Sequence, residues 1–176
     1  MDVLNLGQHH HTEESGRLHL DHNVERAIRS VLRLVLVASA AFKEPHSFAI
    51  AFDGSATGRK MVETVARSPM LRDLTCHVIM AGDETPMVRA HLSWARTALG
   101  AADFEVELAV VAREPEAALP IYLKQHAVDL LVMGAYGHSR IRQLIVGSTT
   151  PHCFARAQYQ CWCCAKPQAR GVRRNP

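Results

Sequence analysis

Apolar runs alternate with amphipathic segments between residues 47 and 133, and this alternation constrains the fold more than any other feature. The apolar runs have the length and composition of buried strands; they are 47–52, 74–80, 104–111 and 130–133. The intervening segments place apolar side chains at helical spacing; they are 57–68, 86–99 and 116–126. Strands that alternate with helices form a parallel sheet with both faces covered. The sequence therefore predicts an α/β fold.

Length, composition and charge restrict the class of protein. The 176 residues give room for one α/β domain and a little more, and 48% hydrophobic residues with 21% charged residues are typical of a folded core. No apolar run is long enough to cross a membrane, and the first residues lack the pattern of a signal peptide. A net charge of +3 is too small to indicate nucleic-acid binding. We expect a cytoplasmic protein with neither a membrane nor a nucleic-acid partner.

The segment 134–150, directly after the fourth predicted strand, has the pattern of a phosphate site. Glycines at Gly134, Gly137 and Gly147 allow a ligand to approach the main chain closely. The last glycine precedes Ser148, a residue type that favours the start of a helix, where free amide groups attract anions. The spacing matches neither the Walker A pattern nor the dinucleotide fingerprint. Glycines that only shape turns are the alternative, but their position between a strand and a Ser-Thr pair favours phosphate binding.

This glycine spacing resembles the ATP-binding signature of the universal stress protein family, and the resemblance covers about residues 47–157. It implies a doubly wound parallel five-stranded sheet, in the order 3-2-1-4-5, with helices on both faces. It also implies that the nucleotide lies over the strand ends between strands 1 and 4, where the strand order reverses. The expected cofactor is ATP, with any Mg²⁺ held mainly by the phosphates.

The resemblance also implies the residues that hold the nucleotide. Asp53 would contact the ribose or the adenine edge, the backbone of Met80 would lie beside the adenine, and the glycine segment would hold the phosphates. The implied nucleotide-binding residues are Asp53, Gly54, Ser55, Met80, Gly134, Gly137, His138, Arg140, Gly147, Ser148 and Thr149. The alternative role of Asp53 is a cap for the following helix, which is compatible with a nucleotide contact, and the alternative role of Met80 is strand packing. No catalytic or metal-binding residue is predicted.

The first residues of the chain echo a later segment. Residues 2–7 match 129–134 at an offset of 127, and the element order agrees up to residue 39. We interpret 1–39 as the C-terminal remnant of a preceding copy of the fold, 40–46 as a linker, 47–165 as the nucleotide-binding domain and 166–176 as a basic tail. Asp21 stands where the later copy has Ser148. A carboxylate repels phosphates, so the remnant is not expected to bind nucleotide.

The C-terminal segment departs from the family. Relatives have a strand of the type Pro-Val-Leu-Val-Leu, often at a dimer edge, whereas residues 160–165 read Gln-Cys-Trp-Cys-Cys-Ala. Redox and zinc roles for these cysteines have little support, because neither a strand-to-helix turn nor two spaced cysteine pairs are present. A one-base shift of the reading frame explains the string better. We expect residues 34–37 to pair at the sheet edge left open, within the chain or with a second chain.

Three functions remain open. The first is an ATP-binding, nucleotide-responsive stress module that forms a homodimer or joins a related partner through an edge strand. Because no Walker-B-like carboxylate pair and no nucleophile–base pair is evident, we expect at most slow ATP hydrolysis and not an efficient enzyme. The second is a degenerate partner-binding module that no longer holds nucleotide. The third, a zinc or thiol protein, rests only on the cysteines near the C-terminus.

Overall fold

The structure, a computed structural model, describes residues 3–7, 34–38, 44–111, 115–134 and 160–164, and the side chains of 44–111 and 118–133. The described elements in chain order are β1 (Val3–Gly7), β2 (Leu34–Ala38), β3 (Ser47–Ala51), α2 (Ala56–Ala66), the 3₁₀ turn η1 (Pro69–Leu71), β4 (Thr75–Ala81), α3 (Pro86–Gly100), β5 (Val106–Val111), α4 (Pro115–Gln125), β6 (Leu130–Gly134) and β7 (Gln160–Cys164). From β3 to β6, strands and helices alternate as the sequence predicts.

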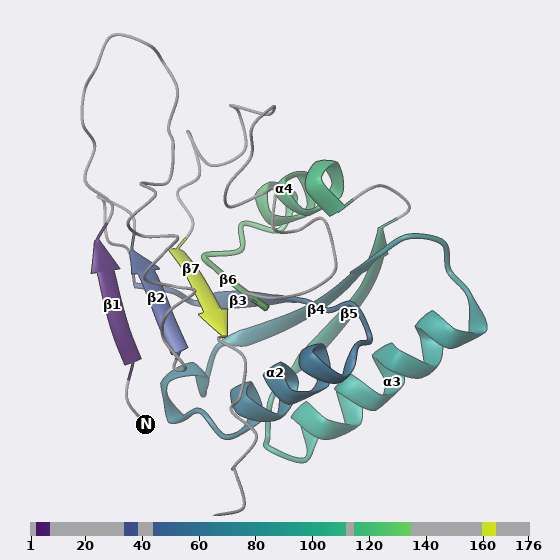
Figure 1. Ribbon diagram of the computed structural model, residues 1–176, viewed down its shortest axis with the longest axis horizontal. Helices are drawn as coiled ribbons and strands as arrows, with labels where there is room; N and C mark the ends of the chain where they lie inside the picture. The colour runs from purple at the N-terminus through teal and green to yellow at the C-terminus, as the bar shows by residue number, and fades with distance from the viewer. Residues whose placement is uncertain (1–2, 8–33, 39–43, 112–114, 135–159, 165–176) are drawn as a thin grey trace, which may run out of the picture.

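All described strands join one seven-stranded sheet in the order β1-β2-β7-β6-β3-β4-β5 (Figure 1). Strand β3 pairs in parallel with β4 and β6, and β4 pairs in parallel with β5. These four strands have the order predicted for strands 1 to 4. Strand β7 lies parallel to β6, at the position predicted for strand 5. The predicted total of five strands is wrong, because the sheet continues beyond β7 through β2 and β1.

The two N-terminal strands extend the sheet beyond β7. Strand β2 pairs antiparallel with β7, with Leu34 opposite Cys164 and Val37 opposite Cys161, and β1 pairs in parallel with β2. The prediction that residues 34–37 pair at the sheet edge is confirmed, and the partner belongs to the same chain. Because β2 satisfies the backbone groups of β7, that strand is no longer an open edge.

Helices α2 and α3 cover one face of the sheet, and α4 covers the other (Figure 1). Helix α2 begins after Ser55, whose hydroxyl accepts a hydrogen bond of 3.0 Å from the amide of Gly58. Helix α3 begins after Thr85, whose hydroxyl accepts from the Val88 amide at 3.2 Å, and Pro86 occupies the first turn. Both caps satisfy amide groups that a helix start leaves free.

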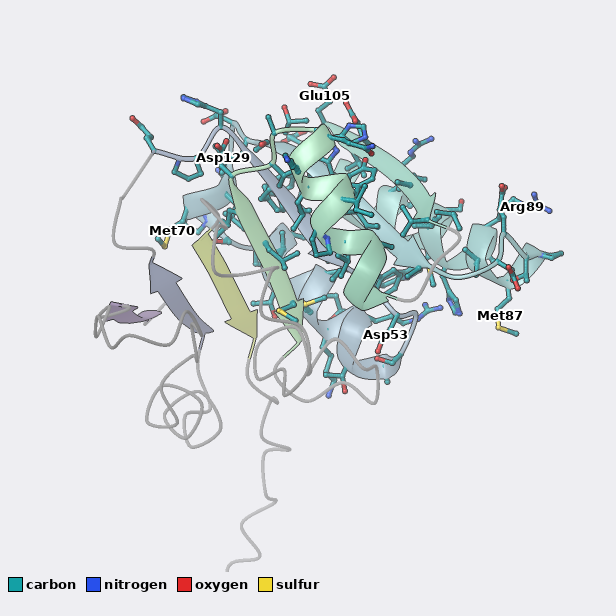
Figure 2. All side chains as sticks on the ribbon, turned by 90° about the horizontal axis from the view of Figure 1, so that it is seen from above. Asp53, Met70, Met87, Arg89, Glu105 and Asp129 are labelled. Atoms are coloured by element: carbon teal, nitrogen blue, oxygen red, sulfur yellow. The ribbon has the colours of Figure 1, made fainter. Side chains whose placement is uncertain are left out.

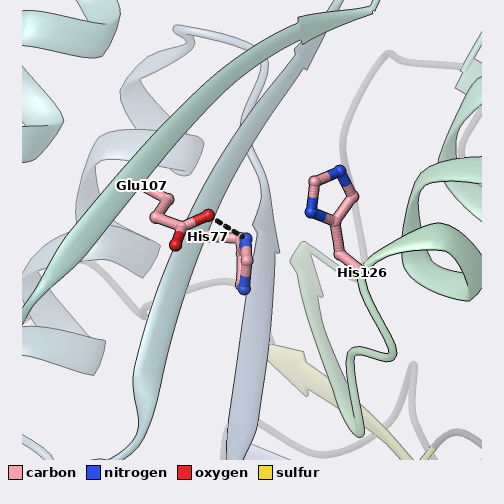
Figure 3. A group of neighbouring side chains, drawn as sticks. All are labelled: His77, Glu107 and His126. Atoms are coloured by element: carbon pink, nitrogen blue, oxygen red, sulfur yellow. Dashed lines mark ion pairs between the residues drawn. The ribbon is translucent and has the colours of Figure 1, made fainter.

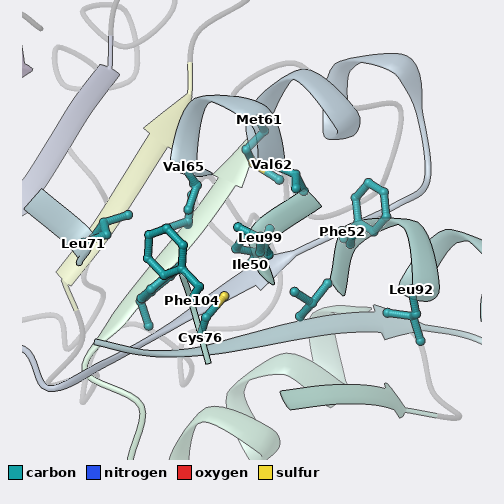
Figure 4. Packing of buried hydrophobic residues seen from close by; sticks show 14 of the residues in the cluster. Ile50, Phe52, Met61, Val62, Val65, Leu71, Cys76, Leu92, Leu99 and Phe104 are labelled. Carbon is teal, nitrogen blue, oxygen red and sulfur yellow. The ribbon is translucent and has the colours of Figure 1, made fainter. Parts of the chain in front are cut away.

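The main core lies between the sheet and the pair α2–α3 (Figure 4). Phe48 of β3 packs edge to face against Phe104, with ring centroids 5.8 Å apart. The largest side chains with almost no exposure in the structure include Phe48, Ile50, Ile79, Leu99, Leu131 and Met133. Burying each such side chain is worth roughly 1.5–3 kcal/mol, so the central strands form a rigid platform for the loops at their ends.

The start of β3 is tied to the start of β6. Asp129 Oδ2 accepts hydrogen bonds from the amide of His46 at 2.9 Å and the amide of Ser47 at 3.3 Å. Ile50 then lies opposite Val132, so the two strands run in phase to their carboxyl ends. No helix in the described ranges is both long and apolar enough to span a bilayer.

Candidate functional site

The carboxyl ends of β3 and β6 form the candidate site. From β3 the chain crosses through α2 to β4 on one side, and it later returns through α4 to β6 on the other side. The strand order therefore reverses at β3, and such reversals open a crevice at the carboxyl ends of parallel strands. Asp53 follows β3 and Gly134 ends β6, so both lie at this edge. Figure 2 shows Asp53 at the opposite end of the sheet from Asp129, where β6 begins.

Asp53 and Ser55 shape the turn that follows β3. The exposed carboxylate of Asp53 accepts a hydrogen bond of 3.0 Å from the amide of Ser55 through Oδ1. The Ser55 hydroxyl, and not Asp53, caps α2, so the alternative of Asp53 as the helix cap is corrected. A carboxylate has about four acceptor positions, so this exposed group can accept further hydrogen bonds, for example from the hydroxyls of a sugar.

Gly54 lies in this turn for two physical reasons. Its φ of +72° is in the left-handed region, which a side chain disfavours. A Cβ at Gly54 would also lie 2.5 Å from Cδ2 of His91 on α3. Nδ1 of His91 is 3.1 Å from Nη2 of Arg59 on α2. The Arg59 guanidinium in turn lies 4.5 Å from the ring centroid of Trp94. The turn therefore rests against a set of fixed side chains, which the sequence alone did not identify.

Met80 lies near the carboxyl end of β4, beside β3. Its side chain is only 6% exposed and belongs to the core below α2 and α3. Met80 pairs with Val110 of β5 in the sheet ladder. The side chain therefore has the packing role given above as the alternative, and any contact between Met80 and a ligand must come from its backbone.

The structure brings together the expected ligand residues that it describes. Asp53, Gly54 and Ser55 form one turn, the end of β4 lies beside it, and β6 ends on its other side at Gly134. The other expected nucleotide-binding residues lie outside the described residues; they are Gly137, His138, Arg140, Gly147, Ser148 and Thr149. Their role in phosphate binding stays a prediction.

A second polar cluster lies on the face covered by α4. His77 of β4 is buried, with Nδ1 3.3 Å from Oε2 of Glu107 on β5 and 3.2 Å from the hydroxyl oxygen of Tyr122 on α4. Burial lowers the pKa of His77, while the neighbouring Glu107 carboxylate raises it and His126 lowers it. Burial also raises the pKa of Tyr122, so its hydroxyl stays protonated at neutral pH.

Sequence reasoning missed this second cluster. The available signal was a histidine inside an apolar strand and a glutamate early in the next strand. Only the sheet register places His77 directly beside Glu107. The tertiary fold then places the end of α4 over His77 and Glu107. Residue spacing in the sequence cannot predict that these residues come together.

Comparisons with known proteins agree on one family. The family model described as the universal stress protein family matches residues 46–164. The curated universal stress protein Slr1230 from Synechocystis is 38% identical over 151 residues, which are 85% of this chain and 53% of that protein. This chain thus spans about half the length of that relative.

Solved structures show the same fold. A universal stress protein from Archaeoglobus fulgidus DSM 4304 has a TM-score of 0.65 at 16% identity, covering 93% of this chain and 60% of the other. A putative universal stress protein from Pseudomonas aeruginosa UCBPP-PA14 has a TM-score of 0.57 at 13% identity, covering 94% of this chain and 63% of the other. At such identities the likeness concerns the fold and not the ligand of this chain.

Proposed function

The chain belongs to the universal stress protein family, and from this premise we propose that it binds ATP at the sheet edge where β3 and β6 end. In this proposal it acts as a nucleotide-responsive stress module in the cytoplasm. One observation carries the proposal: the turn formed by Asp53, Gly54 and Ser55 lies at the switch point of the sheet, beside the end of β6 at Gly134. The glycine segment predicted to hold phosphates starts at that residue.

The two sides of this edge suit the two halves of a nucleotide. On the β3 side, the exposed Asp53 carboxylate offers acceptors for sugar hydroxyls or for the amino edge of adenine. A carboxylate so placed would repel phosphates, which therefore belong on the β6 side. There, Gly137, Gly147, Ser148 and Thr149 supply backbone amides and hydroxyls. Any Mg²⁺ would be held mainly by the phosphates.

A regulatory role suits this edge better than efficient catalysis. Among the described side chains near the turn, His91 contacts Arg59 and packs edge to face against the ring of Phe52, while Asp53 accepts a hydrogen bond from a backbone amide. These contacts build a rigid support and contain no nucleophile–base pair. We propose that binding, with at most slow hydrolysis, is the activity of the site.

Nucleotide carried by the purified protein tests this proposal directly. The protein is purified without added nucleotide and denatured, and the released small molecules are separated by chromatography with absorbance at the adenine maximum. We expect adenine nucleotide from the parent protein and from Glu63→Gln, which changes an exposed carboxylate on α2 away from the turn. Much less is expected from Asp53→Ala. Equal amounts from all three proteins would refute the assignment of Asp53.

We also infer that residues 1–39 derive from a preceding copy of the fold. The parallel pair β1–β2 corresponds to the parallel pair β6–β7 at the offset of 127 residues, with the pairing register shifted by one residue. The antiparallel ladder between β2 and β7 supports this correspondence. In the paired residues Leu36 and Trp162, Leu36 shifted forward by the offset is Cys163, and Trp162 shifted back by it is Val35. Val35 and Cys163 are themselves paired in that ladder. The ladder thus maps onto itself, as it would if a two-fold axis related two copies.

A module that binds a partner and no nucleotide is the second candidate. It is favoured by the altered sequence of β7, where cysteines and a tryptophan stand in place of an aliphatic strand. In either case β2 already covers β7. A homodimer or a related partner that adds to the sheet would therefore pair with β1 or β5, which are the outer strands of the described sheet.

A further inference from the structure

His77, Glu107 and His126 lie together on the α4 side of the sheet, away from the edge assigned to ATP. His77 and Glu107 are opposite each other on β4 and β5, near the start of both strands. His126 directly follows α4. One ligand atom from each residue lies within 4.8 Å of the other two (Figure 3).

The donor set suits a transition metal. Two imidazoles with one carboxylate form the protein ligands of one class of zinc site, which leaves a fourth position for water. Imidazole nitrogen favours zinc and its neighbours over magnesium and calcium, which prefer oxygen ligands. This preference separates the cluster from any Mg²⁺ that accompanies a nucleotide.

The three residues combine one fixed ligand with two that can adjust. His77 is 5% exposed, and the ring of Tyr122 packs edge to face against it at 5.9 Å between centroids. Glu107 has a side chain that is 56% exposed, and His126 is also exposed. Zinc bonds of about 2.0–2.2 Å place the ligand atoms of a tetrahedral site about 3.4 Å apart, so atoms that lie up to 4.8 Å apart must approach one another by at most roughly 1.4 Å. Only the two exposed side chains need to move.

The surroundings of His77 orient its ring. Tyr122 lies with its hydroxyl oxygen 3.2 Å from Nδ1, and its ring stacks on His126 at 4.0 Å between centroids. These ring contacts hold both imidazoles in orientation, and groups that orient metal-binding histidines raise metal affinity. The Tyr122 hydroxyl shares Nδ1 with Glu107, so a metal ion at Nδ1 would displace the hydroxyl as well. The 3.3 Å contact between Nδ1 of His77 and Oε2 of Glu107 is the interaction that a metal ion would replace.

We propose that His77, Glu107 and His126 bind a divalent transition-metal ion of the zinc class and thereby fasten the end of α4 to β4 and β5. The bound ion would connect residues from two strands and one helix terminus. It would rigidify this end of the domain and leave the ATP edge unchanged. The proposal does not depend on ATP binding.

Zinc titration of the full chain tests the proposal. Calorimetry and thermal unfolding with Zn²⁺ are compared for the parent, Glu107→Gln and His126→Gln, which change exposed side chains. His46→Gln, an exposed histidine outside the cluster, is the control. Cysteines elsewhere in the chain can also bind zinc, and that background is common to all four proteins.

We expect the parent and His46→Gln to bind one zinc ion more tightly than either cluster variant by at least about 10-fold. Zinc should raise the midpoint of thermal unfolding of the parent more than that of Glu107→Gln, because a ligand that binds only the folded state stabilises it. Mg²⁺ should do neither. Equal zinc affinity and equal thermal shifts in all four proteins would overturn the proposal, whatever the result for ATP.

Discussion

Replacing Gly54 by alanine tests the turn that presents Asp53. At the φ of +72°, a Cβ has a conformational cost of about 1–2 kcal/mol. The new Cβ would also lie 2.5 Å from Cδ2 of His91, so the imidazole must move. That movement breaks the 3.1 Å contact with Arg59, worth roughly 0.5–1.5 kcal/mol. Together these effects predict that Gly54→Ala lowers the free energy of unfolding by about 1.5–3.5 kcal/mol.

A second substitution separates backbone strain from the clash. In a His91→Ala background the obstructing ring is absent, so Gly54→Ala should lower stability by only the strain of about 1–2 kcal/mol. Gly100→Ala is the control, because a Cβ there meets no atom within 4 Å and its backbone is helical. This change should leave stability unchanged or raise it by up to about 1 kcal/mol.

Urea unfolding, followed by circular dichroism, measures the parent, Gly54→Ala, His91→Ala, the double variant and Gly100→Ala. The reasoning predicts a lowered urea midpoint for Gly54→Ala, a smaller decrease in the His91→Ala background and no decrease for Gly100→Ala. If Gly54→Ala is as stable as the parent, then Gly54 neither has a left-handed conformation nor lies close to His91 in the folded protein.

Three further predictions concern other parts of the chain. Burial raises the pKa of the Cys76 thiol to about 12. The contribution of the buried, protonated thiol to folding stability is therefore complete below the unfolded pKa near 9 and decreases as the pH rises toward 12. Urea unfolding in EDTA should show the parent losing about 2 kcal/mol more than Cys76→Ala between pH 8 and 10.5. Asp53→Asn, whose amide oxygen can still accept from Ser55, should bind adenosine more tightly than Asp53→Ala in calorimetry, and equal affinities would argue against a nucleoside contact. The DNA sequence around the codons for 157–165 should encode a Val/Leu-rich strand in another reading frame, and polar or stop-rich alternative frames would contradict the frame shift.

The central fold is readable from the sequence because each buried strand is a compact apolar run. Residues 47–52 and 130–133 differ from β3 and β6 by one residue at the carboxyl end. The parallel arrangement and the order of these strands follow from the alternation and from right-handed crossovers. Helix starts are also predictable where a cap is present, as at Thr85.

The parts that the sequence did not predict depend on contacts between distant residues. The total number of strands was wrong although the pairing of residues 34–37 at the sheet edge was predicted, because residue spacing did not show that β1 would join the same sheet beyond β2. The support of Gly54 by His91 likewise joins the turn before α2 to α3. Asp53 was expected as a cap alternative, but the better-placed hydroxyl of Ser55 has that role.

Titration calorimetry of ATP into the parent protein and into Gly137→Val measures whether the edge formed by β3 and β6 binds ATP through its phosphates. A valine at Gly137 should exclude the phosphates by bulk, and we expect little loss of helix content because none of the described core residues is changed. We predict that the parent binds ATP, that Gly137→Val does not, and that Ser148→Ala weakens binding only a few-fold, or by roughly 1 kcal/mol. No binding by the folded parent at millimolar ATP would contradict the account, and ATP binding that Gly137→Val leaves unchanged would place the site elsewhere.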